Sequence, residues 1–490
     1  MSRENHLRVL FATSEVFPLI KTGGLADVSG SLPAALQHLG VDVRILVPGY
    51  SSVLSQLEHL KVVAQIDHLP VVGHAQLLLG TIKETSVKVM IVKSPSLYER
   101  TGGPYADANG MEWADNPTRF GVLSRIAALL SGTNSPIQDW IPDIVHCNDW
   151  QTGLTPAYMR LLETTQAKSM ISLHNMAFQG CYPASWLPAL TLPNSHFTLE
   201  GFEYHGQLSF LKAGIYYADS ITTVSPSYAK EIQTPAFGFG LEGLLSKRGN
   251  EIKGILNGID AKEWNPQTDV HLVKPYSASQ LSGKALVKRA LQEKLGLTID
   301  ANAPVLGIVS RLTHQKGLDM LVPIVPQLLA LGCQIVLLGG GESELEHAFR
   351  HLSNEHPSSM SATIGYNEPL SHQIMAGSDM FIMPSRFEPC GLNQLYGLAY
   401  GTPPIVNATG GLADSIINTN IINFKNKTAN GFVLSEASPT SLLSCIKEAL
   451  LIYKNDPAAW KQIQKNGMSQ NLSWDKSALE YLAEYERMLH

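Results

Sequence analysis

The hexapeptide Thr22-Gly23-Gly24-Leu25-Ala26-Asp27 recurs letter for letter as Thr409-Gly410-Gly411-Leu412-Ala413-Asp414. Each copy follows an apolar run typical of a β-strand, residues 7–12 before the first and 403–406 before the second. After the first copy, leucine and valine recur at helical spacing as far as Leu39. A glycine pair between a strand and a helix lets backbone N–H groups approach an anion, and the start of the helix adds partial positive charge. The repeat predicts two phosphate-binding turns or, alternatively, two tight turns without a ligand.

Short β-branched runs alternate with helical segments along most of the chain. Strand-like runs occupy residues 43–47, 88–92, 144–147, 170–173, 220–224, 304–309 and 334–338. Alternation of this kind indicates parallel sheets covered by helices on both faces. We therefore expect an α/β protein of two doubly wound halves facing one cleft. The best candidate for the boundary is the segment 247–265, which combines several turn signals with a loss of periodicity.

Two further helices are predicted in the second half and at the end of the chain. The segment 276–297 carries Lys284, Lys288 and Lys294 between leucines, which predicts a surface helix with solvated charges. The segment Asp475 to His490 places four residues on one face, and we expect that face to be packed against the fold: Leu479, Leu482, Tyr485 and Leu489.

Composition excludes several classes of protein. With 490 residues, 44% hydrophobic and 16% charged, the chain is typical of a globular protein with a large core. A net charge of -6 gives no long-range attraction for nucleic acid or an acidic membrane. Five scattered cysteines without a CxxC pair indicate a reducing compartment, and no apolar run reaches the roughly 18 residues of a membrane helix. We expect a cytoplasmic protein that binds neither nucleic acid nor membrane.

A pair of cations follows the predicted strand 304–309. Arg311 and Lys316 lie five residues apart, at the carboxyl end of that strand, where open α/β sheets bind their ligands. A guanidinium and an ammonium together can hold a diphosphate without a metal ion, although a solvated loop end would show the same residues. Pro323 and Pro326 complicate the helix expected next.

Glu388 follows another buried-looking strand, Met380 to Pro384, at a second strand-to-helix turn. A carboxylate there can accept hydrogen bonds from sugar hydroxyls or stabilise positive charge on a reacting carbon. It can equally interact with the positive end of a helix dipole, which favours carboxylates in first turns. The residues alone leave both functions open.

Two polar clusters follow strands in the first half of the chain. The first is His146-Cys147-Asn148-Asp149-Trp150, and the second begins at His174-Asn175. No further ligand pair at zinc spacing accompanies the His and Cys, so we predict no metal site. Asp149 is a candidate to face substrate, whereas His174 is either a substrate-facing residue or a buried histidine satisfied beneath a loop.

Taken together, six motifs resemble those of bacterial glycogen synthase and plant starch synthase, which form glycosyltransferase family five: Lys21 to Asp27, His146 to Trp150, His174-Asn175, Arg311 to Gly317, Glu388 to Leu392 and Thr409 to Asp414. They follow the family's order and span essentially the whole chain. The resemblance implies the GT-B fold, two Rossmann-like domains facing a deep interdomain cleft. The acceptor-side domain would comprise residues 1–254 with a C-terminal helix at 472–490, and the nucleotide-binding domain residues 255–471.

The resemblance also implies roles for individual residues. Arg311 and Lys316 would neutralise the leaving nucleotide, Lys21 would belong to the donor-binding loop, and Glu388 would contact the donor glucose. His174 and Asp149 would lie beside the transferred sugar and the acceptor, and the ring of Tyr366 would stack on the adenine. Further donor-site positions are Gly23 and Gly24, Asn257, Cys390, Gly391, Leu392, and the turn Thr409-Gly410-Gly411, which would face the phosphates.

Two positions depart from related patterns. Glycosyltransferases outside this family place a second glutamate where this chain has Tyr396, a loss that family five shares. Cys147-Asn148 replaces a more usual Val-His or Ala-His before Asp149, which bears on contacts with the acceptor.

The activity implied by the resemblance is retaining transfer of glucose from ADP-glucose to the nonreducing 4-hydroxyl of an α-1,4-glucan such as glycogen, with ADP released and no metal or cofactor required. The preference for ADP over UDP rests on similarity to the bacterial branch. Three alternatives stay open: a sugar-nucleotide epimerase, a glucan phosphorylase, which would need a lysine for pyridoxal phosphate that we do not find, and a non-catalytic glucan-binding relative. The last should have lost Glu388, Arg311 or Lys316, and all three are present.

Overall fold

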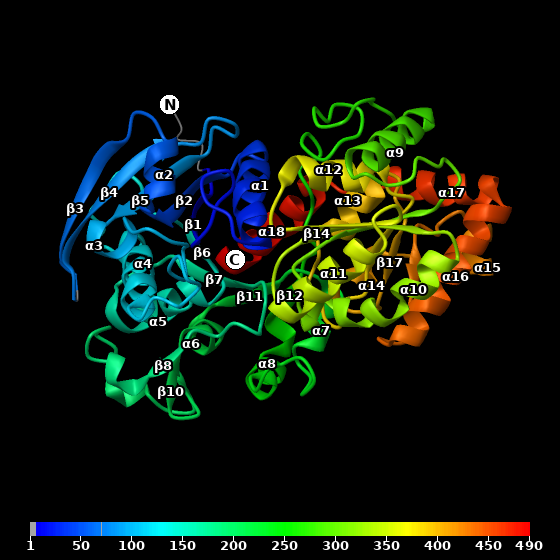
Figure 1. The fold of residues 1–490 in the computed structure, drawn as a ribbon. Coiled ribbons are helices and arrows are strands. Elements are labelled where there is room, and N and C mark those ends of the chain that lie inside the picture. The colour runs from blue at the N-terminus through cyan, green and yellow to red at the C-terminus, as the bar shows by residue number, and fades with distance from the viewer. Residues whose placement is uncertain (1–5, 70) are drawn as a thin grey trace. The chain divides into compact units, whose positions relative to one another are not determined.

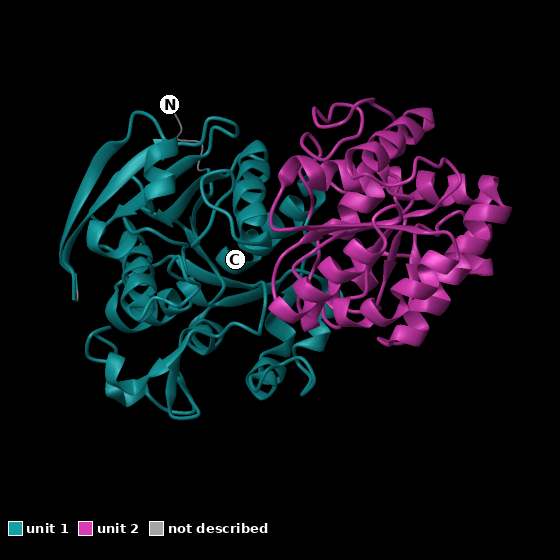
Figure 2. Cartoon of the chain, viewed as in Figure 1, with its two compact units in different colours: residues 1–257, 474–490 teal, residues 258–473 magenta. Residues whose placement is uncertain are grey.

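The computed structural model describes residues 6–69 and 71–490, and the chain divides into two compact units. Unit 1 comprises Met1–Asn257 together with Trp474–His490, and unit 2 comprises Gly258–Ser473 (Figure 2). The division therefore falls inside the turn-rich segment 247–265, and the chain returns to unit 1 for its last helix.

Unit 1 is built on a mostly parallel sheet (Figure 1). In the described part of the chain it has nine strands, in the order β12-β11-β7-β6-β1-β2-β5-β4-β3. Strands β12 to β5 of that order pair in parallel, and β4 and β3 complete one edge antiparallel. The bounds are β1 (Arg8–Ala12), β2 (Asp42–Pro48), β3 (Lys61–Leu69), β4 (Gly73–Thr81), β5 (Lys88–Lys93), β6 (Ile144–Asn148), β7 (Lys168–Leu173), β11 (Ser220–Thr223) and β12 (Ile252–Gly254).

A small antiparallel sheet and several helices complete unit 1. The small sheet contains β8 (Cys181–Pro183), β9 (Glu203–Tyr204) and β10 (Gln207–Ser209). The helices are α1 (Gly24–His38), α2 (Ser51–Gln56), α3 (Pro95–Tyr98), α4 (Asn116–Ser131), α5 (Leu154–Leu162), α6 (Phe210–Tyr217), α7 (Pro226–Glu231), α8 (Glu242–Lys247) and α18 (Trp474–Leu489).

Unit 2 has a fully parallel sheet of six strands among its described residues, in the order β15-β14-β13-β16-β17-β18. The strands are β13 (Val305–Val309), β14 (Gln334–Gly339), β15 (Met360–Ile364), β16 (Met380–Met383), β17 (Pro404–Val406) and β18 (Phe432–Val433). The helices are α9 (Ser282–Lys294), α10 (Val325–Ala330), α11 (Ser343–Glu355), α12 (Glu368–Gly377), α13 (Asn393–Ala399), α14 (Gly410–Ser415), α15 (Ile421–Lys425), α16 (Pro439–Asn455) and α17 (Pro457–Met468).

The sheet of unit 2 buries both of its faces. Leu306 and Ile335 belong to one hydrophobic cluster, whereas their sequence neighbours Val305 and Val336 belong to another. Since successive side chains of a strand point to opposite faces, this split explains why the strands read as continuous apolar runs. The strands predicted from such runs are confirmed in both units to within two residues.

The segment after β13 differs from the prediction of a single helix. It forms three short 3₁₀ turns, His314–Lys316, Leu318–Met320 and Val322–Ile324, before the short helix α10. Pro323 and Pro326 supply no backbone N–H, so a continuous α-helical hydrogen-bond ladder cannot run through this segment.

The prediction of solvated lysines on α9 is wrong for two of the three. Lys284 is buried, and its ammonium donates to the carbonyls of Ala376 and Tyr400 at 2.8 and 3.2 Å and to the Thr402 hydroxyl at 2.6 Å. Burial lowers the pKa of Lys284 to about 7. Lys288 is also buried and pairs with Asp379 at 2.8 Å. These lysines fasten the helix to the unit, and only Lys294 is exposed.

Helix α18 is present as predicted, but only part of its predicted face is buried: Tyr485 is buried and Leu482 is half-buried. Leu479 and Leu489 are 55% and 43% exposed, whereas Ala478, Tyr481 and Tyr485 are fully buried. Tyr485 is hydrogen-bonded to His146 on β6 at 2.7 Å, and Ser220 on β11 donates to Glu484 at 2.6 Å. The helix packs on the sheet through aromatic rings and polar groups that are hydrogen-bonded to residues of β6 and β11. The spacing of leucines does not reveal these contacts.

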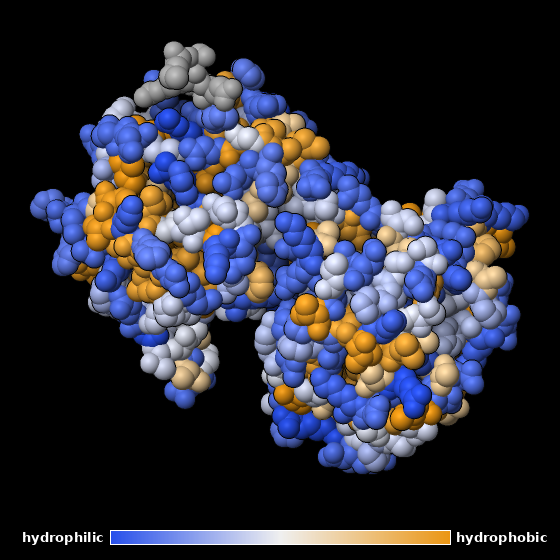
Figure 3. All heavy atoms as spheres, turned by 90° about the horizontal axis from the view of Figure 1, so that it is seen from above, coloured by the Kyte–Doolittle hydropathy of each residue, from blue (hydrophilic) through white to orange (hydrophobic). Residues whose placement is uncertain are grey.

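Hydrophilic side chains dominate the face of the molecule that Figure 3 shows, with smaller hydrophobic patches between them. None of the helices in the described residues combines the length and apolarity needed to cross a membrane.

Candidate functional site

The carboxyl ends of β13, β16 and β17 bring three predicted motifs of unit 2 together. These strands are neighbours in the sheet and run parallel. Arg311 and Lys316 follow β13, Glu388 follows β16, and the second hexapeptide follows β17. Ligands of open α/β sheets bind at this edge, so the topology places these motifs where a binding site is expected.

Lys316 and Glu388 are in direct contact. The Lys316 ammonium lies 2.6 Å from the Glu388 carboxylate, which also accepts a hydrogen bond from the Ser385 hydroxyl at 2.9 Å. Both side chains are largely buried. Helix α13 begins only at Asn393, so the dipole of a following helix does not explain Glu388. The structure instead joins a cation and a carboxylate from distant parts of the sequence.

Two arginines next to this pair have different surroundings. Arg311 is exposed, and its guanidinium lies 3.5 Å from the side-chain oxygen of Gln315. Arg386 makes a bidentate pair with Asp319 at 2.6 and 2.7 Å and donates to the carbonyl of His314 at 2.7 Å. Sequence reasoning missed Arg386, which ties the loop of Glu388 to the loop of Lys316. The only feature of the sequence that could have indicated a role for Arg386 is its position two residues before Glu388.

The second hexapeptide packs against the backbone of the Glu388 loop. A Cβ atom on Gly410 would lie 2.0 Å from the carbonyl oxygen of Glu388, and one on Gly411 would lie 2.1 Å from that of Cys390. Gly410 also has a positive φ of 44°. The N–H of Gly411 donates to the carbonyls of Glu388 and Pro389, both at 3.1 Å. These glycines allow the Glu388 loop to approach the hexapeptide backbone closely, and Thr409 directly precedes the short helix α14.

The remaining predicted residues of unit 2 lie along the same edge. Cys390 is buried, Gly391 has a φ of 71°, and Leu392 is half-buried. Tyr366 follows β15 and is 75% exposed, and its hydroxyl donates to the carboxylate of Glu368. A largely exposed aromatic ring beside the end of a parallel strand suits stacking on a planar ligand.

The first hexapeptide has the same letters but different surroundings. Gly23 precedes the fifteen-residue helix α1, and nothing lies within 4 Å of a Cβ built on it. The backbone N–H and the hydroxyl of Thr22 both donate to the carboxylate of Glu15, the latter at 2.7 Å. Lys21 lies 2.9 Å from Asp27. Gly23 and Gly24 are exposed at the start of a long helix, an arrangement that can receive an anion.

Asp149 and His174 meet in unit 1 at the ends of the neighbouring strands β6 and β7. Asp149 has a φ of 55°, which is unfavourable for a residue with a side chain. Its carboxylate accepts the backbone N–H groups of His174 at 2.7 Å and Asn175 at 3.4 Å. Burial raises the pKa of Asp149 to about 7 although these N–H groups act against it, and burial lowers the pKa of His174 to about 4.

Asn148 orients the His174 ring. Its side-chain oxygen is hydrogen-bonded to Nε2 of His174 at 3.0 Å, and its amide nitrogen donates to the carbonyl of Ala12 at 3.0 Å. The departure noted at Cys147-Asn148 thus places a contact directly on a predicted site residue. His146 is hydrogen-bonded through both ring nitrogens, to Tyr485 and Ser172, so it belongs to the interior of unit 1.

Asn257 is buried at the last position of the first segment of unit 1. Its side-chain oxygen is also buried and accepts no hydrogen bond from the described residues. Since buried polar atoms are nearly always hydrogen-bonded in native proteins, this oxygen is a candidate acceptor for a ligand.

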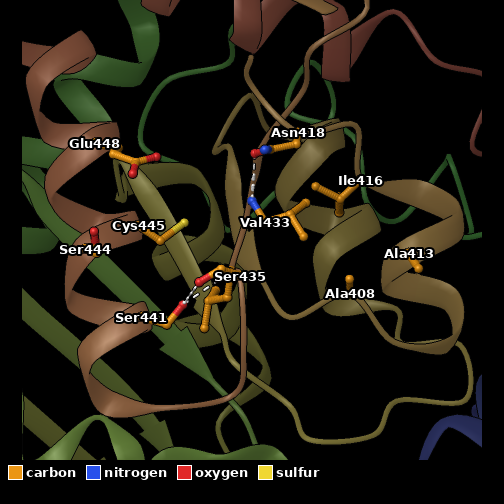
Figure 4. A pocket seen from close by; sticks show the side chains of 11 residues that line it. Ala408, Ala413, Ile416, Asn418, Val433, Ser435, Ser441, Ser444, Cys445 and Glu448 are labelled. Atoms are coloured by element: carbon orange, nitrogen blue, oxygen red, sulfur yellow. Dashed lines mark hydrogen bonds between the residues drawn. The ribbon is translucent and has the colours of Figure 1, made fainter.

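A cavity of about 480 Å³ in unit 2 lies outside this set of residues. It opens near the ends of β17 and β18, and its wall mixes small and aliphatic side chains such as Ala413 and Ile416 with the polar side chains of Asn418 and Glu448 (Figure 4). Ser435 and Ser441 in its wall are hydrogen-bonded to each other at 2.9 Å. None of the predicted site residues lines it, so it adds no chemical group to the candidate site.

Comparison with known families and proteins gives matches along nearly the whole chain. The family model of the starch synthase catalytic domain matches residues 8–247, and that of group 1 glycosyl transferases matches residues 292–467. The glycogen synthase of Nitrosomonas eutropha is 49% identical, over 100% of this chain and 97% of that protein. The glycogen synthase of Nitrosospira multiformis is 48% identical, over 99% and 98% respectively.

Solved structures agree with these matches. The catalytic domain of starch synthase IV from Arabidopsis thaliana, bound to ADP and acarbose, superposes with a TM-score of 0.89 at 32% identity over 99% of both chains. Sucrose-phosphate synthase from Thermosynechococcus elongatus, at 16% identity and a TM-score of 0.61, covers 99% of both chains and shares the fold alone. Two α/β units with parallel sheets are thus common to all three chains.

Proposed function

The chain belongs to the glycogen synthase and starch synthase family of glycosyltransferases, and from this premise we propose that it transfers glucose from ADP-glucose to an α-1,4-glucan. The reaction would retain the anomeric configuration, extend the nonreducing 4-hydroxyl of the acceptor and release ADP. The observation that carries the proposal is the buried contact of Lys316 with Glu388 at the carboxyl edge of the unit 2 sheet. In this contact, the ammonium of Lys316 would face the leaving phosphate and the carboxylate of Glu388 would bind the sugar.

The cationic groups support departure of the nucleotide. As the glycosidic C–O bond breaks, negative charge accumulates on the diphosphate. Arg311, Lys316 and Lys21, together with backbone N–H groups at Gly23 and Gly24, would stabilise that charge more in the transition state than in the ground state. Positive groups held in place before the reaction need no metal ion for this task.

The groups around the sugar support retention. The departing phosphate would accept the proton of the attacking hydroxyl, so that attack and departure take place on the same face of the sugar. His174 has a lowered pKa and is neutral at pH 7, so it adds no positive charge beside the developing oxocarbenium ion. Asp149 holds the backbone at His174, and we place both residues beside the transferred glucose and the acceptor.

The other candidate residues would select and hold the donor. The exposed ring of Tyr366 would stack on the adenine, and the buried amide oxygen of Asn257 would accept a hydrogen bond from the donor. Residues 390–392 and 409–411 would shape the subsite around Glu388. We place the reaction in the cytoplasm, since five scattered cysteines suit a reducing compartment.

The decisive experiment offers the purified protein glycogen with either ADP-glucose or UDP-glucose. Release of nucleotide and extension of glucan chains are followed in the same samples. We expect ADP-glucose to support both, with one glucose added for each ADP released. Nucleotide release without chain extension would contradict the proposal and indicate hydrolysis or epimerisation, and equal rates with UDP-glucose would contradict the proposed donor.

A further inference from the structure

We propose that Glu263, Glu368 and His372 in unit 2 form a binding site for a zinc ion. This inference does not depend on the proposed function. The three residues each offer one ligand atom, and these atoms all lie within 4.8 Å of one another. Glu263 and Glu368 are half-buried, so an ion can reach them from solvent, whereas His372 is only 1% exposed.

The imidazole of His372 is held in one orientation. It stacks on the indole of Trp264 with ring centroids 3.9 Å apart and planes inclined by 11°. Its Nδ1 is hydrogen-bonded to the Asp269 carboxylate at 2.8 Å, and the Tyr400 hydroxyl donates to the same carboxylate at 2.5 Å. The ring therefore cannot turn without breaking these contacts, and its other nitrogen, Nε2, points at Glu368.

Nε2 of His372 is the atom that points to a ligand. It is buried and has no hydrogen-bond partner among the described residues, and the nearest carboxylate oxygen of Glu368 lies 3.7 Å away. A buried nitrogen without a hydrogen bond is uncommon in native proteins. Two carboxylates facing it favour a positive charge in the intervening space. Although burial lowers it, the carboxylates of Asp269 and Glu368 raise the pKa of His372 to about 9, so the ring is protonated near neutral pH. A divalent cation would displace that proton, supply the positive charge and use Nε2 as a ligand.

The donor set suits zinc better than magnesium or calcium. Zinc binds imidazole nitrogen and carboxylate oxygen, whereas the hard cations prefer oxygen alone. A hydrogen bond from the other ring nitrogen to a carboxylate, as His372 makes to Asp269, is the usual support of a zinc-bound histidine. Ligand bonds of about 2.1 Å place tetrahedral ligands about 3.4 Å apart. Small rotations of the two glutamates would close the site, with water as the fourth ligand.

The site would also affect its surroundings. The hydroxyl of Tyr366 donates to the carboxylate of Glu368. An ion bound to the other oxygen of Glu368 would hold that carboxylate, and with it the tyrosine side chain, in one position.

The test uses the full-length protein, freed of metal by dialysis against a chelator. Zinc and magnesium are titrated by calorimetry, and cobalt(II) serves as a spectroscopic probe because its visible absorption reports nitrogen and oxygen ligands. We expect one zinc ion per chain with a dissociation constant in the micromolar range or tighter, and no comparable binding of magnesium. Cobalt should show the absorption of a site with one nitrogen ligand.

Two conservative variants keep the test independent of folding. Glu263→Gln and Glu368→Gln leave the stacked His372 ring and Asp269 in place, and each should weaken zinc binding by at least about tenfold. Glu355→Gln is the matched control, because the Glu355 carboxylate lies 3.4 Å from a different histidine, the exposed His351 on α11, and is not part of the cluster. Absence of micromolar zinc binding, or binding that neither Glu263→Gln nor Glu368→Gln weakens, would overturn the proposal.

Discussion

Lys316 is the side chain on which the proposed chemistry depends most directly. It is largely buried, and its ammonium lies 2.6 Å from Glu388. Replacement by alanine removes a fixed positive charge that, in the proposed mechanism, stabilises the leaving diphosphate chiefly in the transition state. We therefore expect Lys316→Ala to lower kcat by about a hundredfold or more, with a smaller change in KM. Initial rates of ADP release in the presence of glycogen provide the measurement.

The stability of this variant needs its own measurement, because the change leaves the buried Glu388 carboxylate without its cation. Thermal unfolding of Lys316→Ala and of Lys316→Ala with Glu388→Gln separates a loss of stability from a loss of chemistry. Lys294→Ala is the matched control, since Lys294 is exposed on α9. A correctly folded Lys316→Ala protein with unchanged turnover would remove Lys316 from the mechanism.

Asp149 links stability to pH. Its pKa in the folded protein is about 7 against an ordinary value of 3.8, so the folded chain binds a proton that the unfolded chain releases between these values. Stability contributed at this residue therefore falls as pH rises from about 4 to 7, by at most about 4 kcal/mol. Asp149→Asn keeps an oxygen for the N–H of His174 and carries no charge. We expect it to melt at a higher temperature than the parent protein at pH 8, with the difference shrinking at pH 5.

The comparison requires an aspartate without this environment. Asp67→Asn changes an exposed carboxylate on β3 and should give the same small difference at both pH values. If Asp149→Asn changes the melting temperature equally at pH 5 and pH 8, the raised pKa of the buried Asp149 carboxyl group does not cause the change. The test is carried out without substrate, so it stands apart from the catalytic proposal.

The sequence predicts which side chains follow a strand, because apolar runs mark the strands. It does not show which of these side chains touch. Lys316 and Glu388 are separated by 72 positions, and only the adjacency of β13 and β16 brings them into contact. The two hexapeptides have identical letters, yet the first is exposed before a long helix and the second packs on the Glu388 loop. Their difference arises from the neighbouring chain, which the repeat itself does not contain.

Helix α9 is anchored by a buried ammonium. Lys284 donates to two backbone carbonyls and one hydroxyl from distant segments of unit 2. Lys284→Met fills a similar volume but leaves these acceptors without a donor, so we expect a loss of about 2 to 4 kcal/mol in the free energy of unfolding. Lys294→Met on the exposed side of the same helix should stay within about 0.5 kcal/mol of the parent protein. Denaturant unfolding gives the free energy of unfolding of both variants. Equal losses for Lys284→Met and Lys294→Met would contradict the anchoring role of Lys284.

The face of helix α18 provides a second test at the level of secondary structure. Tyr485 is fully buried against β6, whereas Leu479 on the same helix is 55% exposed. Tyr485→Ala removes a buried ring and a hydrogen bond, with an expected loss of about 3 to 5 kcal/mol. Leu479→Ala should change stability by less than about 0.5 kcal/mol. Denaturant unfolding of the two variants decides the matter, because the face predicted from the sequence contains both Tyr485 and Leu479 and would make both substitutions costly.

These two helices show where periodicity is insufficient. It finds the helices correctly, because polar and apolar residues alternate at helical spacing in both. It treats lysine as solvated and leucine as buried, and cannot detect carbonyl groups from distant loops gathered at Lys284 or a histidine on β6 facing Tyr485. Strands of a parallel sheet are easier to predict, because burial on both faces requires an unbroken apolar run.

The candidate residues are distributed over both units of the chain, each with its own sheet and buried core. Lys21, Gly23 and Gly24 belong to unit 1, and Arg311 and Lys316 belong to unit 2. If all of them act on one donor, a single nucleotide should affect segments of both units. Hydrogen exchange read peptide by peptide can test this, since it reports on each segment of the intact protein.

We expect ADP to slow amide exchange around residues 21–25 in unit 1 and around 311–317 and 388–392 in unit 2. At a hundredfold excess over its dissociation constant, ADP would slow exchange by up to about a hundredfold wherever the amide exchanges only from the free protein. Arg311→Ala combined with Lys316→Ala should abolish the effect in both units, because the diphosphate would lose its main cations. Strand β3, far from the candidate residues along the sheet order of unit 1, serves as the internal control. Protection confined to unit 2 would show that Lys21, Gly23 and Gly24 take no part in holding the nucleotide. Protection that survives the double substitution would show that groups other than Arg311 and Lys316 hold the diphosphate.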